Sequence, residues 1–324
     1  MAGVARQGIV IDFWDVGQGD ATVIRPSRLR AFIIDVGPRN SPIVDWVAQS
    51  PSLTIDGIVL THNDADHAGA LAALIDAARF RIECVYLLVD RSAKDSRFVR
   101  LFSRLEAARK AGEVKQVLRL EAPQTVWRDQ TNSVQLNVRY PGMAQNVLAT
   151  SPNVTSAILT LTVDKRIKII WASDAPIEMV ENTCGGSRPE FMVGPHHGAP
   201  IDRADSRTPL WLASIGAQTT LISVGSGNRY SHPQPSYIRS SLRCGSRVVC
   251  TQLTALCDRH RKRDVVKSHA RLGLPQPNTG VACRGPIRIM LLPSGDIIGD
   301  ELDDDHQREI QKLERPKCLL LMPK

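Results

Sequence analysis

The sequence lacks any apolar run close to the roughly 20 residues that a membrane-spanning helix needs. Its first residues, MAGVARQGIVIDF, also lack the basic, apolar and small-residue order of a secretory signal. Cysteines number seven, which is odd, and most follow residue 240, so a full disulfide framework is disfavoured. These absences predict a soluble, cytoplasmic protein in a reducing compartment, with no membrane partner.

Fixed-period repeats and low-complexity segments are absent too, and 324 residues suit one large domain or two small ones. Hydrophobic residues make up 43% of the chain, which is enough to bury a core. The net charge of +8 has two interpretations: solubility, or attraction to a polyanion or phosphate substrate through a positive field. Charge alone does not separate them.

Strand-like runs alternate with helix-like runs in both halves, which predicts an α/β fold of two packed sheets with helices outside. Strands are expected at residues 8–16, 21–26, 30–37, 53–61, 84–90, 134–141, 156–163, 166–173, 189–195, 219–225, 246–252 and 287–299. Helices are expected at residues 41–50, 68–80 and 93–111, directly after residue 174, and near residues 210–216 and 236–243. We expect one domain over residues 1–299, with an insertion at 253–282, followed by a tail over 300–324.

The stretch THNDADH places two histidines and two aspartates, His62, Asp64, Asp66 and His67, between a buried strand and an apolar helix. Imidazole nitrogens and carboxylate oxygens are ligands for divalent metals. Burying such carboxylates without compensation is very costly, and a metal dication turns that cost into binding. The alternative is an exposed turn in which the aspartates cap the helix. Because the turn also carries both histidines, the sequence favours a metal site.

Further ligands must come from elsewhere in the chain. Asp174 ends a strand before a proline-started helix, where an ordinary N-cap is the alternative. His196 and His197 lie on a Gly- and Pro-rich loop after a strand, although adjacent histidines in a loop can be incidental. His232 lies in another such loop, where a turn histidine before proline is the alternative.

These motifs fall in a fixed order: FWDVGQGDATVI with IIDVG, THNDADHAG, SPNVTSAILTL, WASDAP, VGPHHGA and ISVGSGNRYSHPQPS. Together they resemble the metallo-β-lactamase superfamily, and within it the soluble hydrolase domain of the DNA-uptake protein ComEC and its stand-alone relatives. The resemblance spans about residues 9–252 and resumes near 281. It implies an αββα four-layer sandwich and metal-dependent hydrolysis of phosphodiester bonds.

The resemblance also implies a ligand set, because the superfamily pattern His-x-His-x-Asp-His appears here with aspartate as its second member. Seven candidate metal ligands follow: His62, Asp64, Asp66, His67, Asp174, His196 and His197. One metal would take the first two, and the other would take the next two with one of the adjacent histidines. Asp174 would bridge the two metals.

The superfamily's mid-chain histidine has no counterpart, because the stretch SPNVTS supplies Asn153 and Ser156 there. The ligand set is therefore rich in oxygen, which favours manganese or magnesium over zinc, although zinc fits as well. The residues expected to act catalytically are Asp66, Asp174, His197 and His232. The second of the adjacent histidines, or His232, would contact the phosphate.

Two further aspartates lie in the first motif. Gly17 and Gly19 should let the turn VGQGD approach the metals closely. Asp20 is then expected either to orient a ligand histidine without touching a metal or to be a hairpin aspartate. Asp35 is expected to be structural.

The insertion is basic and is flanked by cysteines. Six Lys or Arg residues lie between Arg259 and Arg271, and the run could be a solvated loop or a grip on backbone phosphates. The residues expected to bind nucleic acid are Arg259, Arg261, Lys262, Arg263 and Lys267. Cys250, Cys257 and Cys283, with His260 or His269, could hold a structural zinc, although their spacing fits no standard finger closely. Cys250 and Cys283 should lie on neighbouring strands.

The tail ends in a mixed-charge helix and the apolar stretch CLLLM, which could dock on the body or on a partner protein. The whole sequence predicts a metal-dependent phosphodiester hydrolase that acts on nucleic acid, with DNA favoured. The alternatives are a small-molecule phosphodiesterase, another metallo-hydrolase, or a partner-binding module of a multi-protein system.

Overall fold

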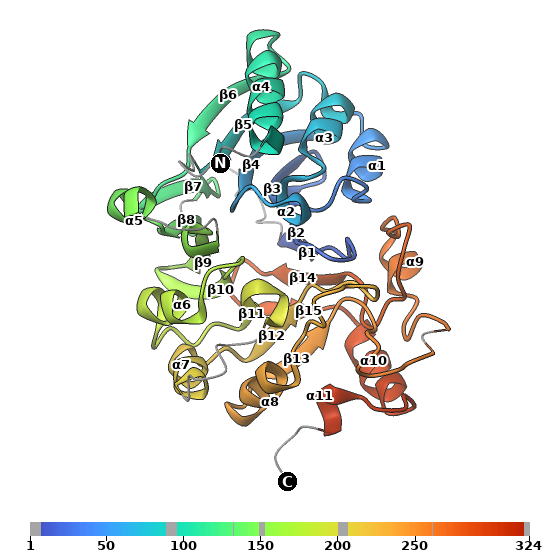
Figure 1. Cartoon of the computed structure of the whole chain (residues 1–324). Coiled ribbons are helices and arrows are strands. Elements are labelled where there is room, and N and C mark those ends of the chain that lie inside the picture. The colour runs from blue at the N-terminus through green and yellow to red at the C-terminus, as the bar shows by residue number, and fades with distance from the viewer. Residues whose placement is uncertain are drawn as a thin grey trace.

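The computed structural model describes residues 8–88, 96–131, 133–148, 153–199, 207–260 and 262–320. Two sheets dominate the fold (Figure 1). The first sheet has eight strands in the order β15 (Ile297–Gly299), β14 (Ile287–Leu291), β1 (Ile9–Phe13), β2 (Ala21–Ser27), β3 (Arg30–Val36), β4 (Thr54–Leu60), β5 (Ile82–Leu87) and β6 (Val114–Arg119). Strands β3 to β6 run parallel, and the other pairs are antiparallel.

The second sheet has seven strands. Their order is β13 (Arg247–Cys250), β12 (Thr219–Ile222), β11 (Phe191–Val193), β10 (Arg166–Trp171), β9 (Ile158–Val163), β8 (Val134–Tyr140) and β7 (Gln124–Arg128). Strands β10 to β13 run parallel, and β7 to β10 run antiparallel. The parallel strands of both sheets are the ones whose ends carry the histidine and aspartate motifs.

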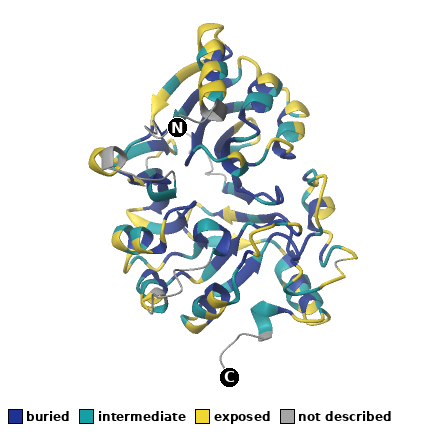
Figure 2. Cartoon of the chain, in the orientation of Figure 1, coloured by how far each residue is buried: buried dark blue, intermediate teal, exposed yellow. Residues whose placement is uncertain are grey.

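Apolar side chains form three main layers of core. One layer lies between the sheets and joins Ile11 and Phe32 of the first sheet to Leu161 and Trp171 of the second. Helices α1 (Ile43–Ala48), α3 (Leu71–Ala78) and α4 (Ser96–Lys110) cover the outer face of the first sheet; α6 (Ile177–Cys184), α7 (Thr208–Ile215) and α8 (Pro235–Arg243) cover that of the second. Burial is deepest along the strands (Figure 2). This arrangement confirms the predicted αββα sandwich.

Two strands were not expected from the sequence. β6 exposes most of its side chains and β7 is also partly exposed, so neither shows the continuous apolar run of a buried strand. By contrast, every residue of β9 is buried, as its sequence ILTLTV predicts. The remaining short elements are α2 (Ala65–Ala68), α5 (Met143–Leu148), η1 (Asn153–Thr155), η2 (Pro195–Gly198), α9 (Ser268–Leu272), α10 (Leu302–Ile310) and α11 (Lys317–Leu320).

The strands that flank the insertion are not neighbours, which corrects the prediction. β13 lies in the second sheet, while β14 crosses to the first sheet and pairs with β1. The residues next to these strands are nevertheless close together. Gln252 and Ala282 form an antiparallel bridge, and the Cys283 amide donates to the Thr251 carbonyl at 2.9 Å. These contacts hold the two ends of the insertion together.

The tail packs on the body of the protein. α11 lies against α8 and β13. Arg284, which is fully buried, pairs with Asp300 and with Asp303 at the start of α10. Over the described residues, no helix combines the length and the apolar character needed to cross a bilayer.

Candidate metal centre

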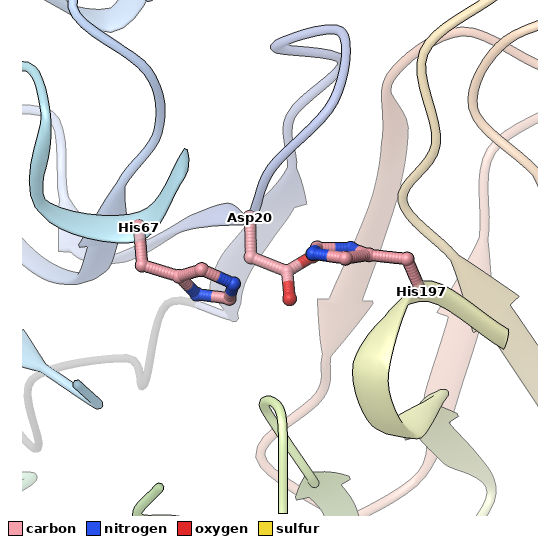
Figure 3. Close-up of side chains that lie close together, drawn as sticks. All are labelled: Asp20, His67 and His197. Atoms are coloured by element: carbon pink, nitrogen blue, oxygen red, sulfur yellow. The ribbon is translucent and has the colours of Figure 1, made fainter. Parts of the chain in front are cut away.

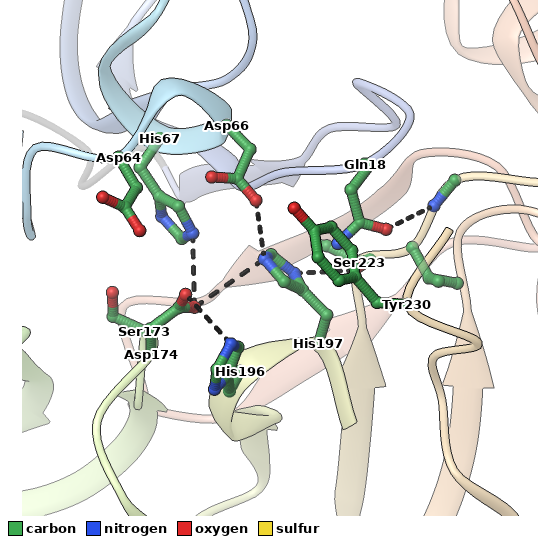
Figure 4. Close-up of polar contacts among 12 residues, drawn as sticks. Gln18, Asp64, Asp66, His67, Ser173, Asp174, His196, His197, Ser223 and Tyr230 are labelled. Atoms are coloured by element: carbon green, nitrogen blue, oxygen red, sulfur yellow. Dashed lines mark hydrogen bonds and ion pairs between the residues drawn. The ribbon is translucent and has the colours of Figure 1, made fainter. Parts of the chain in front are cut away.

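The predicted ligands lie in segments that directly follow parallel strands. Asp64, Asp66 and His67 follow β4, Asp174 follows β10, and the adjacent histidines follow β11. The alternative capping roles are not observed: Asp64 precedes α2 without a side-chain cap hydrogen bond, and Pro176, not Asp174, precedes α6. Six of the seven predicted ligands are labelled together in Figure 4, and Nε2 of His62 lies 3.8 Å from Asp64 and 3.5 Å from Asp174.

Asp174 lies at the middle of this group, and its two carboxylate oxygens face opposite sides. Its Oδ1 is 3.3 Å from Nε2 of His67 and 3.7 Å from Nε2 of His197. Its Oδ2 is 3.5 Å from Nε2 of His62 and 3.6 Å from Nε2 of His196. Each oxygen of this carboxylate therefore lies near a different pair of histidines, as in a ligand that bridges two cations.

Two of the histidine rings are fixed through their other nitrogen. Nδ1 of His62 lies 3.3 Å from the Thr61 hydroxyl and 3.2 Å from the Ser173 hydroxyl. Nδ1 of His67 donates to the Asp35 carboxylate at 2.8 Å. Such partners fix ring orientation and tautomer, so each Nε2 is directed toward Asp174.

His197 is held in the same way, because its Nδ1 donates to the Ser223 carbonyl at 2.9 Å. The inward Nε2 atoms of His62, His67 and His197 are buried and have no hydrogen-bond partner, and the same is true of Oδ1 of Asp174 and of Asp20. Leaving such a group unsatisfied costs about 1–3 kcal/mol. A divalent cation would satisfy all of them at once, so the residues present fit a metal.

The ionisation of the group also suits a cation. Burial alone would raise the pKa of Asp66, but the His197 ring, 3.3 Å away, and the His67 charge outweigh it and lower that pKa to about 2. Burial alone would lower the pKa of His197, but Asp174 and Asp66 raise it to about 9. Asp66 therefore holds its charge and His197 holds a proton, which metal binding at His197 must release.

The adjacent histidines reach opposite sides of Asp174 because the backbone turns sharply between them. His196 and His197 both have positive φ, at 48° and 53°. Such left-handed conformations cost of order 1–3 kcal/mol each for non-glycine residues and often mark functional sites. Gly198 follows with φ +73, and a Cβ there would lie 2.7 Å from Cβ of Pro233. His196 stays 40% exposed on the open side of the group.

Asp20 and Asp35 differ from their expected roles. Asp35, expected to be structural, is the carboxylate that orients His67. Asp20 makes no such hydrogen bond in the part of the chain described, and instead lies with His67 and His197 in a group whose ligand atoms are within 4.8 Å of one another (Figure 3). Burial raises the pKa of Asp20.

The VGQGD turn lies close to the backbone of α2 at Gly19, whereas a Cβ at Gly17 would meet only Gln252, at 3.9 Å. A Cβ at Gly19 would lie 2.1 Å from the Asp66 carbonyl oxygen, and the Asp20 amide donates to that oxygen at 3.2 Å. Any side chain at Gly19 would push the turn away from α2 and withdraw Asp20 from the histidines.

The remaining predicted residues lie around the group. Asn153 begins η1 and Ser156 follows it. The Ala157 amide donates to the Thr61 carbonyl at 2.9 Å, which places this segment beside the end of β4. The buried Ser156 hydroxyl has no hydrogen-bond partner. His232 lies with its ring centroid 5.8 Å from that of His196. Burial, with the positive charges of His197 and His196, lowers the pKa of His232 to about 4, so the ring is neutral at pH 7.

Sequence reasoning did not single out Tyr230 and Arg229. The Tyr230 ring stacks on His232 at 5.7 Å and is 53% exposed, and the Arg229 guanidinium lies 5.4 Å from the Tyr230 ring centroid. Together they form an exposed aromatic and cationic rim beside His196. The only sequence signal for them was their place in the loop motif that also carries His232.

The basic insertion lies apart from these ligands. Arg259, Lys262, Arg263 and Lys267 are exposed, and Arg261 lies outside the described residues. Lys262 and Arg263 line an open groove that also contains Glu309 and Glu314 of the tail. Acidic neighbours partly cancel the positive field, which weakens the expected phosphate grip.

Neither histidine predicted for the cysteine site lies there. His260 is exposed, and its amide donates to its neighbour Asp258 at 2.8 Å. His269 turns the other way, with Nε2 3.3 Å from the buried Asp15 carboxylate. The expected set of Cys250, Cys257, Cys283 and either histidine is therefore not assembled.

Part of this chain matches a known protein family, and its fold is similar to solved structures. Residues 14–133 match the family model described as Metallo-beta-lactamase superfamily. No curated protein matches the sequence. Among solved structures, the metallo-beta-lactamase fold protein YhfI from Bacillus subtilis is 12% identical, with 75% of this chain and 96% of that chain covered and a TM-score of 0.45.

Two other similar structures are unliganded yeast PDE1 and the short form of human tRNase Z. The first is 10% identical, with 76% of this chain and 98% of that chain covered and a TM-score of 0.48. The second is 14% identical, with 67% and 92% covered and a TM-score of 0.42. The segment that matches the family model carries the Asp20, Asp35 and THNDADH positions, and this match supports placing the chain in the metallo-β-lactamase superfamily.

Proposed function

We propose that the protein is a two-metal hydrolase of phosphodiester bonds, with nucleic acid, and DNA in particular, as its substrate. The observation that carries the proposal is the Asp174 carboxylate, whose oxygens face separate pairs of histidine Nε2 atoms. The orphaned inward atoms around it make a metal-free role costly.

The ligands divide into two sides. His62, Asp64 and His196 would hold one cation, so that His196 takes the place of the missing mid-chain histidine. On the other side Asp66, His67 and His197 would hold the second, with Asp20 close enough to add an oxygen. When bound, a pair of divalent cations polarises a phosphoryl group and lowers the pKa of water.

The donor set favours hard cations. Four carboxylates, Asp20, Asp64, Asp66 and Asp174, supply oxygen, and no cysteine is among the residues that converge there. Carboxylate-rich sites suit manganese and magnesium, and thiolate-rich sites suit zinc. We therefore expect manganese to support turnover better than zinc.

The rim residues support an extended anionic substrate. Arg229 is exposed and positively charged, and the Tyr230 face offers a surface on which a base can stack. The neutral His232 beside His196 can donate a hydrogen bond from its ring N–H to a phosphate oxygen without adding charge. The net charge of +8 favours encounter with a polyanion.

The test is a substrate panel on the purified protein loaded with manganese, magnesium or zinc. The panel contains single- and double-stranded DNA, RNA, a small phosphodiester and a lactam. The expected result is cleavage of DNA and of the small phosphodiester with manganese, and little or no lactam turnover. Turnover of the small phosphodiester alone would favour a small-molecule enzyme, and turnover of the lactam alone would overturn the proposal.

A further inference from the structure

A second group of potential metal ligands lies at the edge of the second sheet, remote in sequence from the central motifs. Four of the seven cysteines and one histidine line a single enclosed cavity: Cys250, Cys257, Cys283, Cys318 and His306. We call these five residues the thiol cluster. The cavity has about 20 Å³ open to the centre of a water-sized sphere, which is room for one small ion. All four thiols are free.

The backbone holds the contributing segments together. The Arg284 amide donates to the Cys250 carbonyl at 3.1 Å, which joins the segment after the insertion to the end of β13. The Arg315 amide donates to the Cys257 carbonyl at 2.9 Å, which joins the tail to the start of the insertion. Apolar residues, among them Leu253 and Ile310, pack around the cysteines.

His306, on α10, gives the cluster a nitrogen donor. It is buried, and its Nε2 lies 3.5 Å from Sγ of Cys283. Two ligands bound to one tetrahedral zinc, at about 2.3 Å for sulfur and about 2.0–2.1 Å for nitrogen, lie about 3.5 Å apart.

The ordinary alternative is that these cysteines are small apolar residues of a core, as buried cysteines often are. Cys84, Cys184 and Cys244 fit that description, because Cys84 lies on β5, Cys184 ends α6 and the Cys244 thiol donates to the Pro209 carbonyl. Packing does not require four thiols and a histidine from separate segments to line one cavity.

We propose that the thiol cluster is a structural zinc site that fastens α10 and α11 to the end of β13. Its four ligands are drawn from the five donors, with Cys283 and His306 already at ligand spacing. Within the described chain, three ligand atoms lie within 4.8 Å of one another only at the central site. Zinc binding would therefore draw the half-buried Cys257 and Cys318 side chains inward by rotation about χ1.

The site is independent of the proposed hydrolase function, and its test uses protein that lacks the central bridging carboxylate. In Asp174→Asn protein, stripped of metal and reloaded with zinc, we expect about one tightly held equivalent after dialysis, measured by elemental analysis. Adding Cys318→Ser or Cys257→Ser should remove that equivalent. Cys244→Ser, a half-buried cysteine outside the cluster, should leave it in place.

A second measurement keeps the test valid if a cysteine variant does not fold. Cobalt bound to the Asp174→Asn protein with all cysteines intact should give the intense near-ultraviolet thiolate-to-metal absorption, because soft thiolates would be its ligands. Absence of that band, with no retained zinc and with all four thiols open to alkylation in the folded protein, would overturn the proposal.

Discussion

The central carboxylate–histidine group and the thiol cluster both lie largely below the surface, yet they are built differently. In the central group each buried histidine is fixed through Nδ1, and the segment that carries His196 and His197 has strained, left-handed backbone. In the thiol cluster the sulfur atoms are surrounded by apolar side chains, and the hydrogen-bond contact described between its members joins Cys283 to His306.

This difference indicates a catalytic role for the central group and a structural role for the thiol cluster. Fixed rings, retained carboxylate charge and a half-exposed His196 keep the central group ready for a ligand that exchanges with solvent. A largely enclosed cavity lined by thiols suits a permanently bound structural ion. We therefore expect changes in the central group to alter hydrolysis, and changes near the thiol cluster to alter how the tail is held.

The largest effect on hydrolysis is expected from a change at Asp174. Asp174→Asn removes the charge that both histidine pairs share, while the volume hardly changes. We expect hydrolysis to fall by at least about 100-fold, because even partners outside the ligand set cost about 10–100-fold. Rates with manganese would be compared with those of Asp164→Asn, an exposed turn residue, and full activity in Asp174→Asn would refute the bridging role.

A second, smaller effect is expected at Asp35. Asp35→Asn keeps a partner near Nδ1 of His67 but removes the charge, and should weaken manganese binding about 10–100-fold. Asp12→Asn is the matched control, since Asp12 is equally buried and pairs with Arg25 and Arg288 away from the centre. Isothermal titration would measure both variants, and unchanged affinity in Asp35→Asn would show that His67 is positioned by packing alone.

A third effect is expected in the tail, where the stability of the ion pairs that hold α10 should depend on pH. Burial alone would raise the pKa of Asp303, but Arg247 and Arg284 lower it from its ordinary value of 3.8. The ion pairs therefore contribute stability above about pH 3.8, and this contribution is lost as the pH falls further. We estimate about 1 kcal/mol, because Asp303 is partly exposed.

Hydrogen exchange along α10, corrected for intrinsic rates, should show faster opening at pH 3 than at pH 5. Asp303→Asn should remove most of that difference. If the difference persists in the variant, another acidic group controls how the tail docks.

The smallest effect is expected in the insertion. Replacing Arg261, Lys262 and Arg263 by alanine should slightly weaken binding of long DNA and reduce its salt dependence, by about 0.9 in logarithmic slope for each phosphate that the protein no longer neutralises. Cleavage of a small phosphodiester should be unchanged. Equal losses on both substrates would mean that the insertion supports the fold rather than binding nucleic acid.

The sequence was most informative where chemistry and strand ends coincide. THNDADH follows β4 and WASDAP follows β10, and buried strands rarely lead into such polar turns without a ligand to receive them. The two-sheet architecture followed from apolar runs such as β9.

The rest depended on contacts that no local pattern records. Asp35 reaches His67 across 32 positions of sequence, and the sequence gives no measure of which aspartate, Asp20 or Asp35, lies nearer. His306 and Cys318 approach Cys283 only because the tail folds back, so spacing suggested the histidines of the insertion instead. The partly polar β6 was missed because it lies at the edge of its sheet.

The pairing of β1 with β14 has a consequence for biosynthesis. Asp12 and Arg288 are bonded across 276 positions, so β1 leaves the ribosome well before its second neighbour, β14, is made. At about 5–20 residues per second, that delay is of the order of 15–60 s. During it β1 has an open edge that can pair with other nascent chains. Truncation before residue 287 would leave that edge without its β14 partner.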